Sequence, residues 1–456
     1  MGSPASDLGA RYKTKTAVFL KENRLPGAAV GVVHGSELAY ACGVGFADVH
    51  KRRSCDPQTL YRIASITKTF TATAIMQLRD AGCLGLDDPV VTIVPELRKI
   101  QHPFGPIESI TIRRMLSHES GLQRDPPGTD WGRNAYDGSI ERTFSRAAEI
   151  STLVPASCQH KYSNLTYQVL GEVVARVSGV SYPQYVRERI LDPLGMRSTS
   201  FDPLPADLEA RTATGYDARH FSDELGVADP SPEFWSEAGL WSCVEDLARW
   251  LAFQMEGTTS AQREVLSETT RREMHRPRYL CDEMWAAAIG IGWWAERADK
   301  VTWVFHGGGI YSGFTTHVCF DPKERVGAIA MINGIGNPSQ LAMDLAKIAW
   351  EAVHEAALPI QPPPATPSAW RPLLGLYMAP FGYMIRVEWR DGKLTIVDPT
   401  TPFLPRLSPT ETADDFVCDP GGDEWGDHIR FIRTADGRVK ALLLCSTTYV
   451  RLGPVE

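Results

Sequence analysis

The residues of this sequence best suited to chemistry are Ser65 and Lys68, a serine and a lysine three positions apart. Residues i and i+3 share one face of a helix, so Lys68 would hold its amine beside the Ser65 hydroxyl. A serine hydroxyl is a weak nucleophile until a neighbouring base takes its proton, and a neutral lysine amine can act as that base. The pair therefore predicts nucleophilic catalysis through an acylated serine.

The helix that would present this pair is indicated by apolar or small residues spaced three to four positions apart. They recur from Ile66 to Ala81 and stop before Gly82. This stripe predicts a buried central helix with Ser65 in its first turn, where the helix dipole favours developing negative charge. A lone S-x-x-K also fits an amphipathic helix with a serine cap and a solvated lysine, so the interpretation depends on partners elsewhere.

Two further motifs supply such partners. Tyr162-Ser163-Asn164 precedes a segment with helical periodicity, and His306-Gly307-Gly308-Gly309 follows a strand-like run. Each of S-x-x-K, Y-x-N and H-x-G occurs once, in that order. Alone, the tyrosine and the histidine would fit structural roles and the glycines a turn. Together, the three motifs predict one site.

In these motifs the sequence resembles the serine β-lactamase and penicillin-binding-protein superfamily, specifically its class C-like branch of esterases, D-amino-acid peptidases and amidases. The resemblance runs from about residue 10 to residue 353, and it includes Leu116–Leu122, Pro193–Met196 and Ala238–Ser242. It implies an α+β fold, in which an antiparallel sheet is flanked by helices and carries an inserted helical subdomain.

The resemblance also implies a role for each catalytic residue. Ser65 matches the acylated nucleophile and Lys68 its base. Tyr162 matches the tyrosine that shuttles a proton to the leaving group, and Asn164 matches the residue that hydrogen-bonds the lysine and the substrate. His306 takes the position of the lysine in the K-T-G motif of β-lactamases.

The same resemblance implies an oxyanion hole made by the backbone N–H groups of Ser65 and Gly309. Consecutive glycines fit this role, because they let a strand edge approach the reacting carbonyl group. We take four further residues as candidates for substrate contact: Gly307, Gly308, Trp235 and Gly239.

The histidine in the third motif bears on the substrate. A lysine there would supply a fixed cation for the carboxylate of a penicillin, whereas a histidine is largely neutral at pH 7 unless a neighbour raises its pKa. We therefore expect weak or no β-lactamase activity, and ester or amide substrates that include D-amino-acid peptides. Two alternatives stay open. One is an acyltransferase or penicillin-binding-protein-type thioesterase that cyclises a carrier-bound nonribosomal peptide, and the other is a ligand-binding sensor that acylates without turnover.

Composition restricts the partners and the location. The 456 residues carry a net charge of -8 and no basic block, which argues against nucleic acid. No stretch has the pattern of a membrane span or an export signal, and the nine cysteines are scattered without C-x-x-C pairs. We predict a cytoplasmic protein that acts on a small-molecule ester, amide or peptide without cofactor or metal. Homo-oligomer formation stays open.

Strand-like runs outside the helical segments indicate the sheet. Ala28–Val33 and Leu38–Val44 flank a turn signal and predict a hairpin. Further strands are expected at Val301–Phe305, Thr315–Phe320 and Val326–Ile332, and flanking helices at Asp7–Leu25 and Ser339–Ala357.

The domain organisation follows from changes along the chain. Helical segments at about 86–290, with one helix expected over Ile140–Leu153, would be inserted into a hydrolase domain of residues 1–357. A proline-rich stretch at 358–370 predicts a semi-rigid linker. Residues 371–456 then alternate in short runs separated by two Asp-Gly pairs, which are hairpin signals. This pattern predicts a C-terminal all-β barrel that resembles the lipocalin-like barrel of the same branch.

Overall fold

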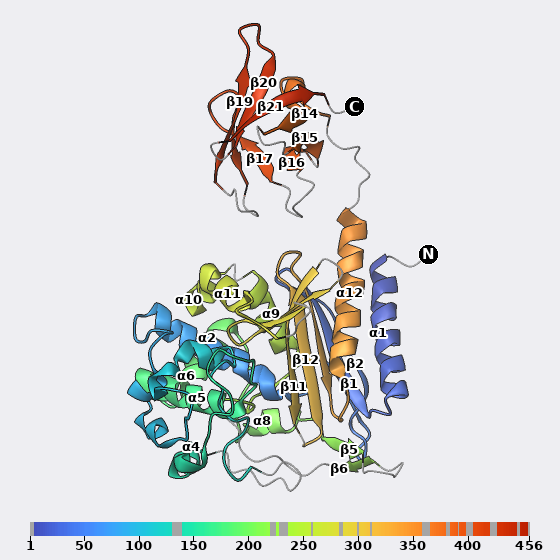
Figure 1. Cartoon of the computed structure of the whole chain (residues 1–456). Coiled ribbons are helices and arrows are strands. Elements are labelled where there is room, and N and C mark those ends of the chain that lie inside the picture. Colours follow the sequence, from blue (N-terminus) through green and yellow to red (C-terminus); the bar gives the residue numbers. More distant parts are fainter. Residues whose placement is uncertain are drawn as a thin grey trace. The chain divides into compact units, whose positions relative to one another are not determined.

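The structure is a computed structural model in which the chain forms two compact units, Met1–Val353 and His354–Glu456 (Figure 1). The fold class is as predicted, with helices around an antiparallel sheet in the first unit and a β-barrel in the second. Residues 358–364 of the predicted linker lie outside the described residues. The structure describes residues 4–129, 139–218, 225–227, 236–256, 259–281, 286–298, 301–310, 312–357, 365–379, 384–390, 392–397, 405–419, 426–444 and 447–454.

A nine-stranded sheet forms the centre of the first unit, in the order β3-β2-β1-β13-β12-β11-β10-β9-β8. All neighbouring strands are antiparallel, and the predicted hairpin is β1 with β2. The strands are β1 (Gly27–His34), β2 (Glu37–Asp48), β3 (Arg53–Ser54), β8 (Tyr279–Leu280), β9 (Ala287–Ile289), β10 (Trp294–Ala298), β11 (Val301–Ile310), β12 (Phe314–Asp321) and β13 (Val326–Ile332).

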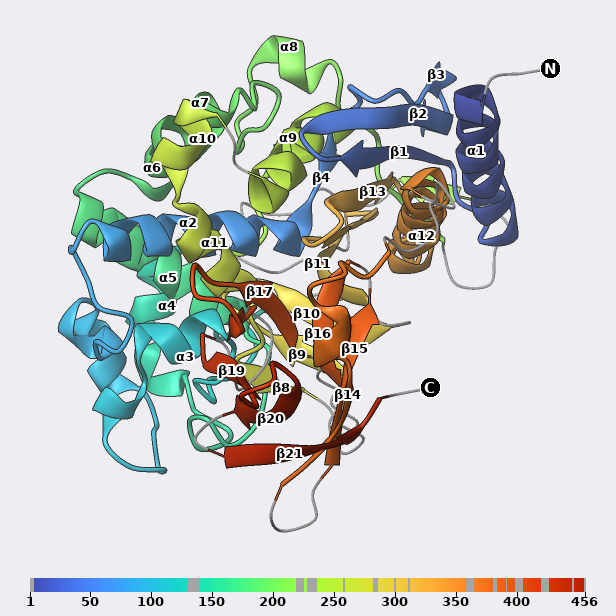
Figure 2. The same ribbon diagram turned by 90° about the horizontal axis from the view of Figure 1, so that it is seen from above.

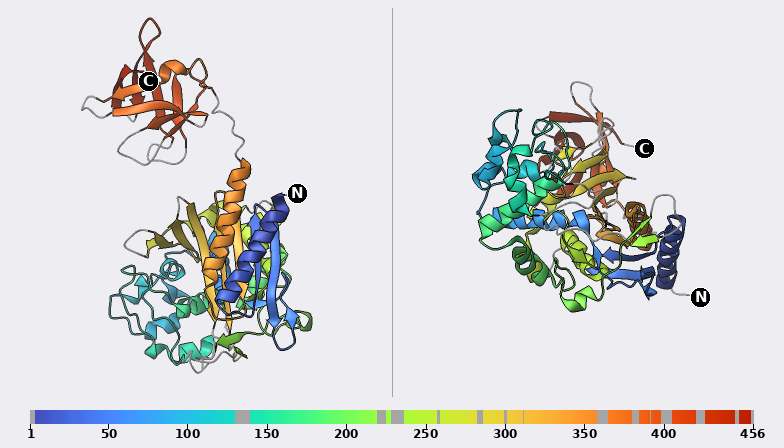
Figure 3. Two further views of the ribbon diagram at one scale, coloured as in Figure 1. Left: turned by 90° about the vertical axis from the view of Figure 1, so that its right-hand side faces the viewer. Right: turned by 90° about the horizontal axis from the view of Figure 1, so that it is seen from below.

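Helices cover both faces of this sheet, and each face has its own core. On one face α1 (Pro4–Glu22) and α12 (Pro338–Ala357) pack against the strands (Figures 2 and 3). On the other face α9 (Val244–Met255) packs against the strands, and α2 (Thr67–Asp80) and α5 (Asn164–Ser178), which pack against each other, belong to the same core. The periodic stripe after Ser65 therefore forms the buried central helix that the sequence predicts.

The remaining elements of the first unit are short. Ile140–Leu153 was expected to be one helix, but α4 ends at Ser145, because Ile150, Thr152 and Leu153 form backbone hydrogen bonds with Gln101 and Gly121. Among the described helices, none combines the length and the hydropathy needed to cross a membrane. The short elements are α3 (Ile112–Leu116), α4 (Ile140–Ser145), α6 (Tyr182–Val186), α7 (Asp192–Leu194), α8 (Ala206–Glu209), α10 (Ser260–Val265), α11 (Glu268–His275), β4 (Tyr61–Arg62), β5 (Tyr216–Ala218), β6 (Leu225–Val227) and β7 (Trp241–Ser242).

The second unit is a closed barrel in which each strand from β14 to β21 pairs with the next and β21 pairs with β14. Alternate residues fill its interior, as the burial of Ile385 and Val387 in β15 illustrates. Closure leaves no open sheet edge among these strands. The strands are β14 (Gly375–Met378), β15 (Met384–Arg390), β16 (Lys393–Val397), β17 (Arg406–Pro409), β18 (Asp415–Cys418), β19 (His428–Arg433), β20 (Val439–Leu444) and β21 (Thr447–Gly453).

Candidate active site

Ser65 lies in a 3₁₀ turn, Ala64–Ile66, that leads directly into α2. The preceding residue, Ala64, has a φ of +45°, which is unfavourable for a residue with a Cβ atom. The carbonyl oxygen of Ile63, the residue before Ala64, accepts two hydrogen bonds. One comes from the backbone N–H of Ile66 and one from the Thr316 hydroxyl, each at 3.1 Å. These contacts hold the strained turn that presents Ser65 at the start of the helix.

Lys68 lies one turn further on, with its side chain completely buried. Its Nζ atom is 3.0 Å from Ser65 Oγ, 2.8 Å from Asn164 Oδ1 and 2.7 Å from the carbonyl oxygen of Glu237. No described carboxylate lies within 4.0 Å of this amine. A neutral amine could keep two of these contacts as donations, to Asn164 and Glu237, and direct its lone pair at the Ser65 hydroxyl.

Asn164 begins α5, and both ends of its side-chain amide have partners. While Oδ1 accepts from Lys68, Nδ2 donates to Asp125 Oδ1 at 2.7 Å. A carboxylate can only accept, so Asp125 fixes which way the amide faces. Sequence reasoning did not identify Asp125, because no local motif joins it to Asn164.

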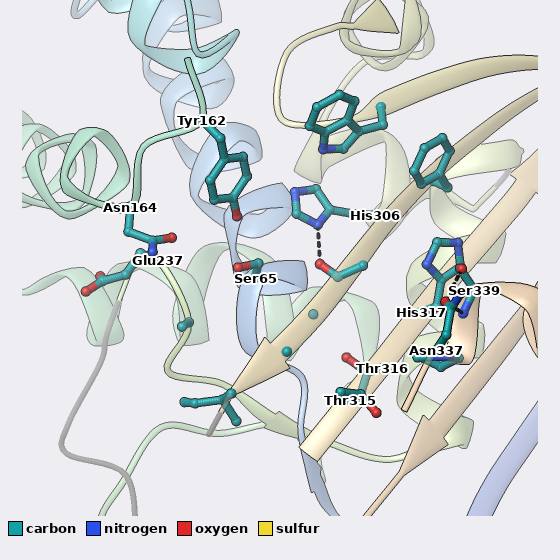
Figure 4. Close-up of a pocket in the computed structure, with 18 of the residues that line it drawn as sticks. Ser65, Tyr162, Asn164, Glu237, His306, Thr315, Thr316, His317, Asn337 and Ser339 are labelled. Atoms are coloured by element: carbon teal, nitrogen blue, oxygen red, sulfur yellow. Dashed lines mark hydrogen bonds between the residues drawn. The ribbon is translucent and has the colours of Figure 1, made fainter. Parts of the chain in front are cut away.

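Tyr162 completes the group around Lys68. Its ring centroid lies 5.1 Å from Lys68 Nζ, and Figure 4 shows its hydroxyl pointing toward Ser65. The His118 ring packs against the Tyr162 ring with centroids 4.3 Å apart. The phenol ring is thus supported by an aromatic contact that the motifs did not reveal.

His118 also anchors the backbone of the Y-x-N loop. Its Nδ1 accepts the Ser163 N–H at 3.2 Å, and its carbonyl accepts the Lys161 N–H at 2.8 Å. Ser163 in turn caps α5 by accepting the Thr166 N–H at 3.1 Å. Burial holds the pKa of His118 well below its usual range, so this ring acts as a neutral support. His118, which lies in the Leu116–Leu122 segment, therefore supports both the Tyr162 ring and the loop that carries it.

His306 lies within β11, two per cent exposed, and Figure 4 shows its ring beside Tyr162. Its Nδ1 is 2.7 Å from the Gly307 carbonyl oxygen, which can only accept, so Nδ1 carries the proton and Nε2 is free to accept. Burial, and then the nearby Lys68, lower the pKa of His306 to about 3. The side chain is therefore neutral at pH 7.

The buried histidines predict how stability depends on pH. Burial lowers the pKa of His275 and His306 to about 3 and of His317 to about 4, from 6.5. At a pH between the folded and the unfolded pKa, the unfolded chain binds more protons than the folded protein does. The free energy of unfolding therefore falls as the pH drops below about 6.5. His306→Gln should make this decline shallower by about 1 kcal/mol per pH unit between pH 6 and 4.5. Urea unfolding would measure it, with exposed His34→Gln as control. Equal slopes for His306→Gln and wild type would contradict the prediction.

The glycines of the third motif lie inside a strand rather than at its end. The strand expected to end at Phe305 continues to Ile310, because β12 pairs with it throughout, with Gly308 opposite Thr316. A Cβ atom on Gly308 would lie 2.1 Å from the Ile63 carbonyl oxygen, whereas one on Gly309 would meet only Thr315 Cγ2, at 3.8 Å. Only at Gly308 does the close approach to the Ser65 turn require glycine.

Gly308→Ala should therefore destabilise the protein by about 1–3 kcal/mol, the usual range for overpacking a tight site. It should also lower activity, because relief of the clash must displace the turn before Ser65. Gly309→Ala should change stability by no more than about 0.5 kcal/mol. Denaturant unfolding of both variants would measure the difference. Similar losses in the two would refute the assignment of the close contact to Gly308.

These residues line one cavity of about 530 Å³. It brings together Ser65, Tyr162, Asn164, His306 and the three glycines. The Lys68 amine does not line the cavity but contacts both Ser65 and Asn164. Gly239, expected to contact substrate, is not among its lining residues. The chain turns inward there, since the Leu240 N–H bonds Thr67 Oγ1, and Glu237 and Ala238 line the cavity instead. Trp235 lies outside the described residues.

Comparisons with known proteins identify relatives of the first unit. A family model described as Beta-lactamase matches residues 13–349. Protein flp of Staphylococcus aureus strain MW2 is 27% identical over 325 residues, which cover 69% of this chain and 61% of that protein. Beta-lactamase-like protein 2 of Dictyostelium discoideum is 28% identical over 359 residues, which cover 75% of this chain and 61% of that protein. The chain thus spans about 61% of the length of these relatives.

Solved structures extend the likeness in fold to both units. The octameric penicillin-binding protein homologue from Pyrococcus abyssi superimposes with a TM-score of 0.64 at 24% identity, covering 98% of this chain and 100% of that one. The structure of SurE gives a TM-score of 0.60 at 23% identity, with 98% and 99% covered. A class C beta-lactamase from Rhodobacter sphaeroides gives a TM-score of 0.62 at 23% identity, and the match covers 76% of this chain and 99% of that one.

Proposed function

Because the chain belongs to the beta-lactamase family, we propose that it is a serine hydrolase that forms an acyl-enzyme on Ser65. Membership of the family supports hydrolase chemistry in general. The observation that carries the specific proposal is the 3.0 Å contact between Lys68 Nζ and Ser65 Oγ, at the floor of a cavity large enough for a small ester or peptide.

Acylation begins when Lys68 takes the Ser65 hydroxyl proton. The serine oxygen forms a bond to the substrate carbonyl carbon, and the carbonyl oxygen becomes an oxyanion. The protonated amine keeps three hydrogen-bond acceptors around it, on Ser65, Asn164 and Glu237. Both protonation states of Lys68 are thus accommodated without moving the side chain, which is what a proton carrier in a buried site needs.

The second half of the reaction uses Tyr162 and two backbone N–H groups. The N–H groups of Ser65 and Gly309 stabilise the oxyanion, and Tyr162 relays the proton from Lys68 to the leaving group as the carbonyl–leaving-group bond breaks. Water then attacks the acyl-enzyme, transfers a proton by the same route and releases Ser65. The neutral His306, with a free Nε2, accepts a hydrogen bond in this arrangement and adds no charge.

The neutral His306 at the third motif supports ester or amide substrates over β-lactams. His306 is neutral because burial lowers its pKa to about 3, so it does not supply the fixed cation of a lysine. Arg124 and Glu237 are the charged residues among the described ones that line the cavity. Arg124 lies beside Tyr162, with its guanidinium carbon 5.9 Å from the ring centroid. Weak or absent β-lactamase activity is part of the proposal.

A panel of substrates tests this function. We expect turnover of p-nitrophenyl butyrate and of at least one D- or L-aminoacyl amide, and a rate on nitrocefin, a chromogenic β-lactam, at least 100-fold lower. Intact-protein mass spectrometry should detect the butyryl adduct. Adding an amine acceptor would divert the acyl group if the protein is an acyltransferase, and an adduct without product would indicate a sensor. Nitrocefin turnover that equals ester turnover would refute the substrate assignment.

A further inference from the structure

The cavity does not end at Ser65 but continues around the edge of β11. Beyond the Trp294–Phe305 pair, described residues of β11 pair only with β12, so its other edge is open. Figure 4 shows His317, Asn337 and Ser339 grouped apart from Ser65, Tyr162 and Asn164. We call this second part of the cavity the aromatic lobe. It is lined by Trp294, Phe305, Thr315, His317, Asn337 and Ser339.

Three rings from three adjacent strands form one wall of the aromatic lobe. Trp294 and Phe305 have centroids 6.3 Å apart and planes 19° apart, and Phe305 and His317 are 5.4 Å and 24° apart. Trp294 and Phe305 are partly exposed. Near-parallel rings of this kind, left partly uncovered, offer a stacking surface for another planar group.

Gly307 and Gly309 leave space in the aromatic lobe because they have no side chains. A Cβ atom on Gly307 would lie 3.3 Å from His317 Nδ1, and one on Gly309 would lie 3.8 Å from Thr315 Cγ2. A side chain at position 307 would lie against the His317 ring, and one at position 309 would lie against Thr315. The glycines therefore shape the lobe as well as the approach to Ser65.

The aromatic lobe ends at the ring of His317. His317 is only five per cent exposed, and its ring nitrogens form no hydrogen bond with the described residues. The ring nitrogens keep contact with the solvent in the cavity. A polar group of a bound molecule could replace that solvent as their hydrogen-bond partner.

The charge of the lobe decides what kind of molecule fits. None of the described residues that line it is charged at pH 7, since burial lowers the pKa of His317 to about 4. At the start of α12, Pro338 has no N–H group, and Asn337 Oδ1 accepts the Ser339 N–H at 3.3 Å. An anionic group would therefore meet no fixed cation there, and an uncharged one is favoured.

We propose that the aromatic lobe binds an uncharged aromatic ring of the substrate, with a polar group on the rim of that ring hydrogen-bonded to His317. The inference rests on the proposed function, because it assigns one part of the molecule that Ser65 acylates or releases. Stacking on such rings contributes about 0.5–1.5 kcal/mol per contact beyond the area buried, or roughly 2- to 12-fold in kcat/KM.

Matched esters test the proposal from both sides of the scissile bond. One pair is ethyl phenylacetate and ethyl cyclohexylacetate, and the other is benzyl acetate and cyclohexylmethyl acetate. Wild type should prefer the aromatic member of at least one pair, and Phe305→Leu should reduce that preference roughly 2- to 10-fold. Phe104→Leu, which changes an exposed surface ring, should retain it. In addition, 4-carboxybenzyl acetate should be a poorer substrate than benzyl acetate, and the reverse order would overturn the proposal.

A binding measurement separates this proposal from the proposed function. Equilibrium dialysis of the same esters with Ser65→Ala, which cannot turn them over, reports the aromatic preference without catalysis. If Ser65 is acylated but neither kinetics nor binding favours the aromatic esters over the cyclohexyl ones, the proposed role of the aromatic lobe is wrong. The proposal of a serine hydrolase is then unaffected. If no acyl-enzyme forms, the proposed hydrolase function is wrong. The dialysis result alone then shows whether the aromatic lobe binds aromatic rings. Trp294→Leu, at a partly exposed ring, replaces Phe305→Leu should the latter fail to fold by circular dichroism.

Discussion

Replacing Ser65 with alanine is expected to remove the butyryl adduct and to lower the turnover of p-nitrophenyl butyrate by about 10⁴- to 10⁶-fold. The loss is this large because the oxygen that carries the acyl group is itself removed, and the remaining groups cannot form the intermediate. Intact-protein mass spectrometry and product release would measure the two effects in the same samples.

The Ser65→Ala variant should fold normally, because only one oxygen is removed from a site that faces a cavity. Ser145→Ala, which truncates an exposed serine of α4, is the matched control and should retain adduct and turnover. If Ser65→Ala keeps either signal at the wild-type level, Ser65 is not the nucleophile. The chemistry would then have to be assigned to another residue of the cavity.

Lys68→Met is expected to slow acylation by about 10²- to 10⁴-fold, the usual contribution of a positioned general base. Methionine fills similar space but cannot accept the Ser65 proton. It also leaves Asn164 Oδ1 and the Glu237 carbonyl without their donor, so we expect a loss of stability of about 1–3 kcal/mol. Stopped-flow acylation with p-nitrophenyl butyrate and denaturant unfolding would separate the two effects.

The pH dependence distinguishes a base from a structural lysine. If Lys68 only supports the fold, the acylation rate of folded Lys68→Met should follow the wild-type pH profile at a reduced level. If it is the base, the profile should change in shape, and hydroxide should restore part of the rate at alkaline pH. Lys13→Met, at an exposed lysine of α1, is the matched control and should match wild type in rate and stability. A wild-type profile in Lys68→Met would assign the proton transfer elsewhere.

Local spacing explains why helix α2 could be predicted. Apolar residues from Ile66 to Ala81 repeat with the period of a helix, and this repeat is independent of the rest of the chain. The same spacing places Lys68 beside Ser65, as the 3.0 Å contact between them illustrates. The hairpin of β1 and β2 was also predictable, because its turn lies between two strand-like runs.

Long-range pairing explains where the prediction failed. Three consecutive glycines have low strand propensity, so β11 was expected to end at Phe305. Pairing with β12 carries it to Ile310 and brings Gly308 against Ile63. Pairing within the barrel likewise defines the strands β14, β17 and β18, since runs of four residues carry little periodicity of their own.

The sequence by itself determined the family, the two-unit fold class and the residues proposed to react, because these depend on motif types, their order and local periodicity. Only the tertiary structure decided what surrounds them. Lys68 meets the Glu237 carbonyl across 169 positions of sequence, and His118 meets the Ser163 N–H across 45. Such contacts depend on how helices and strands dock, and docking is set by packing over the whole core, which no local pattern records.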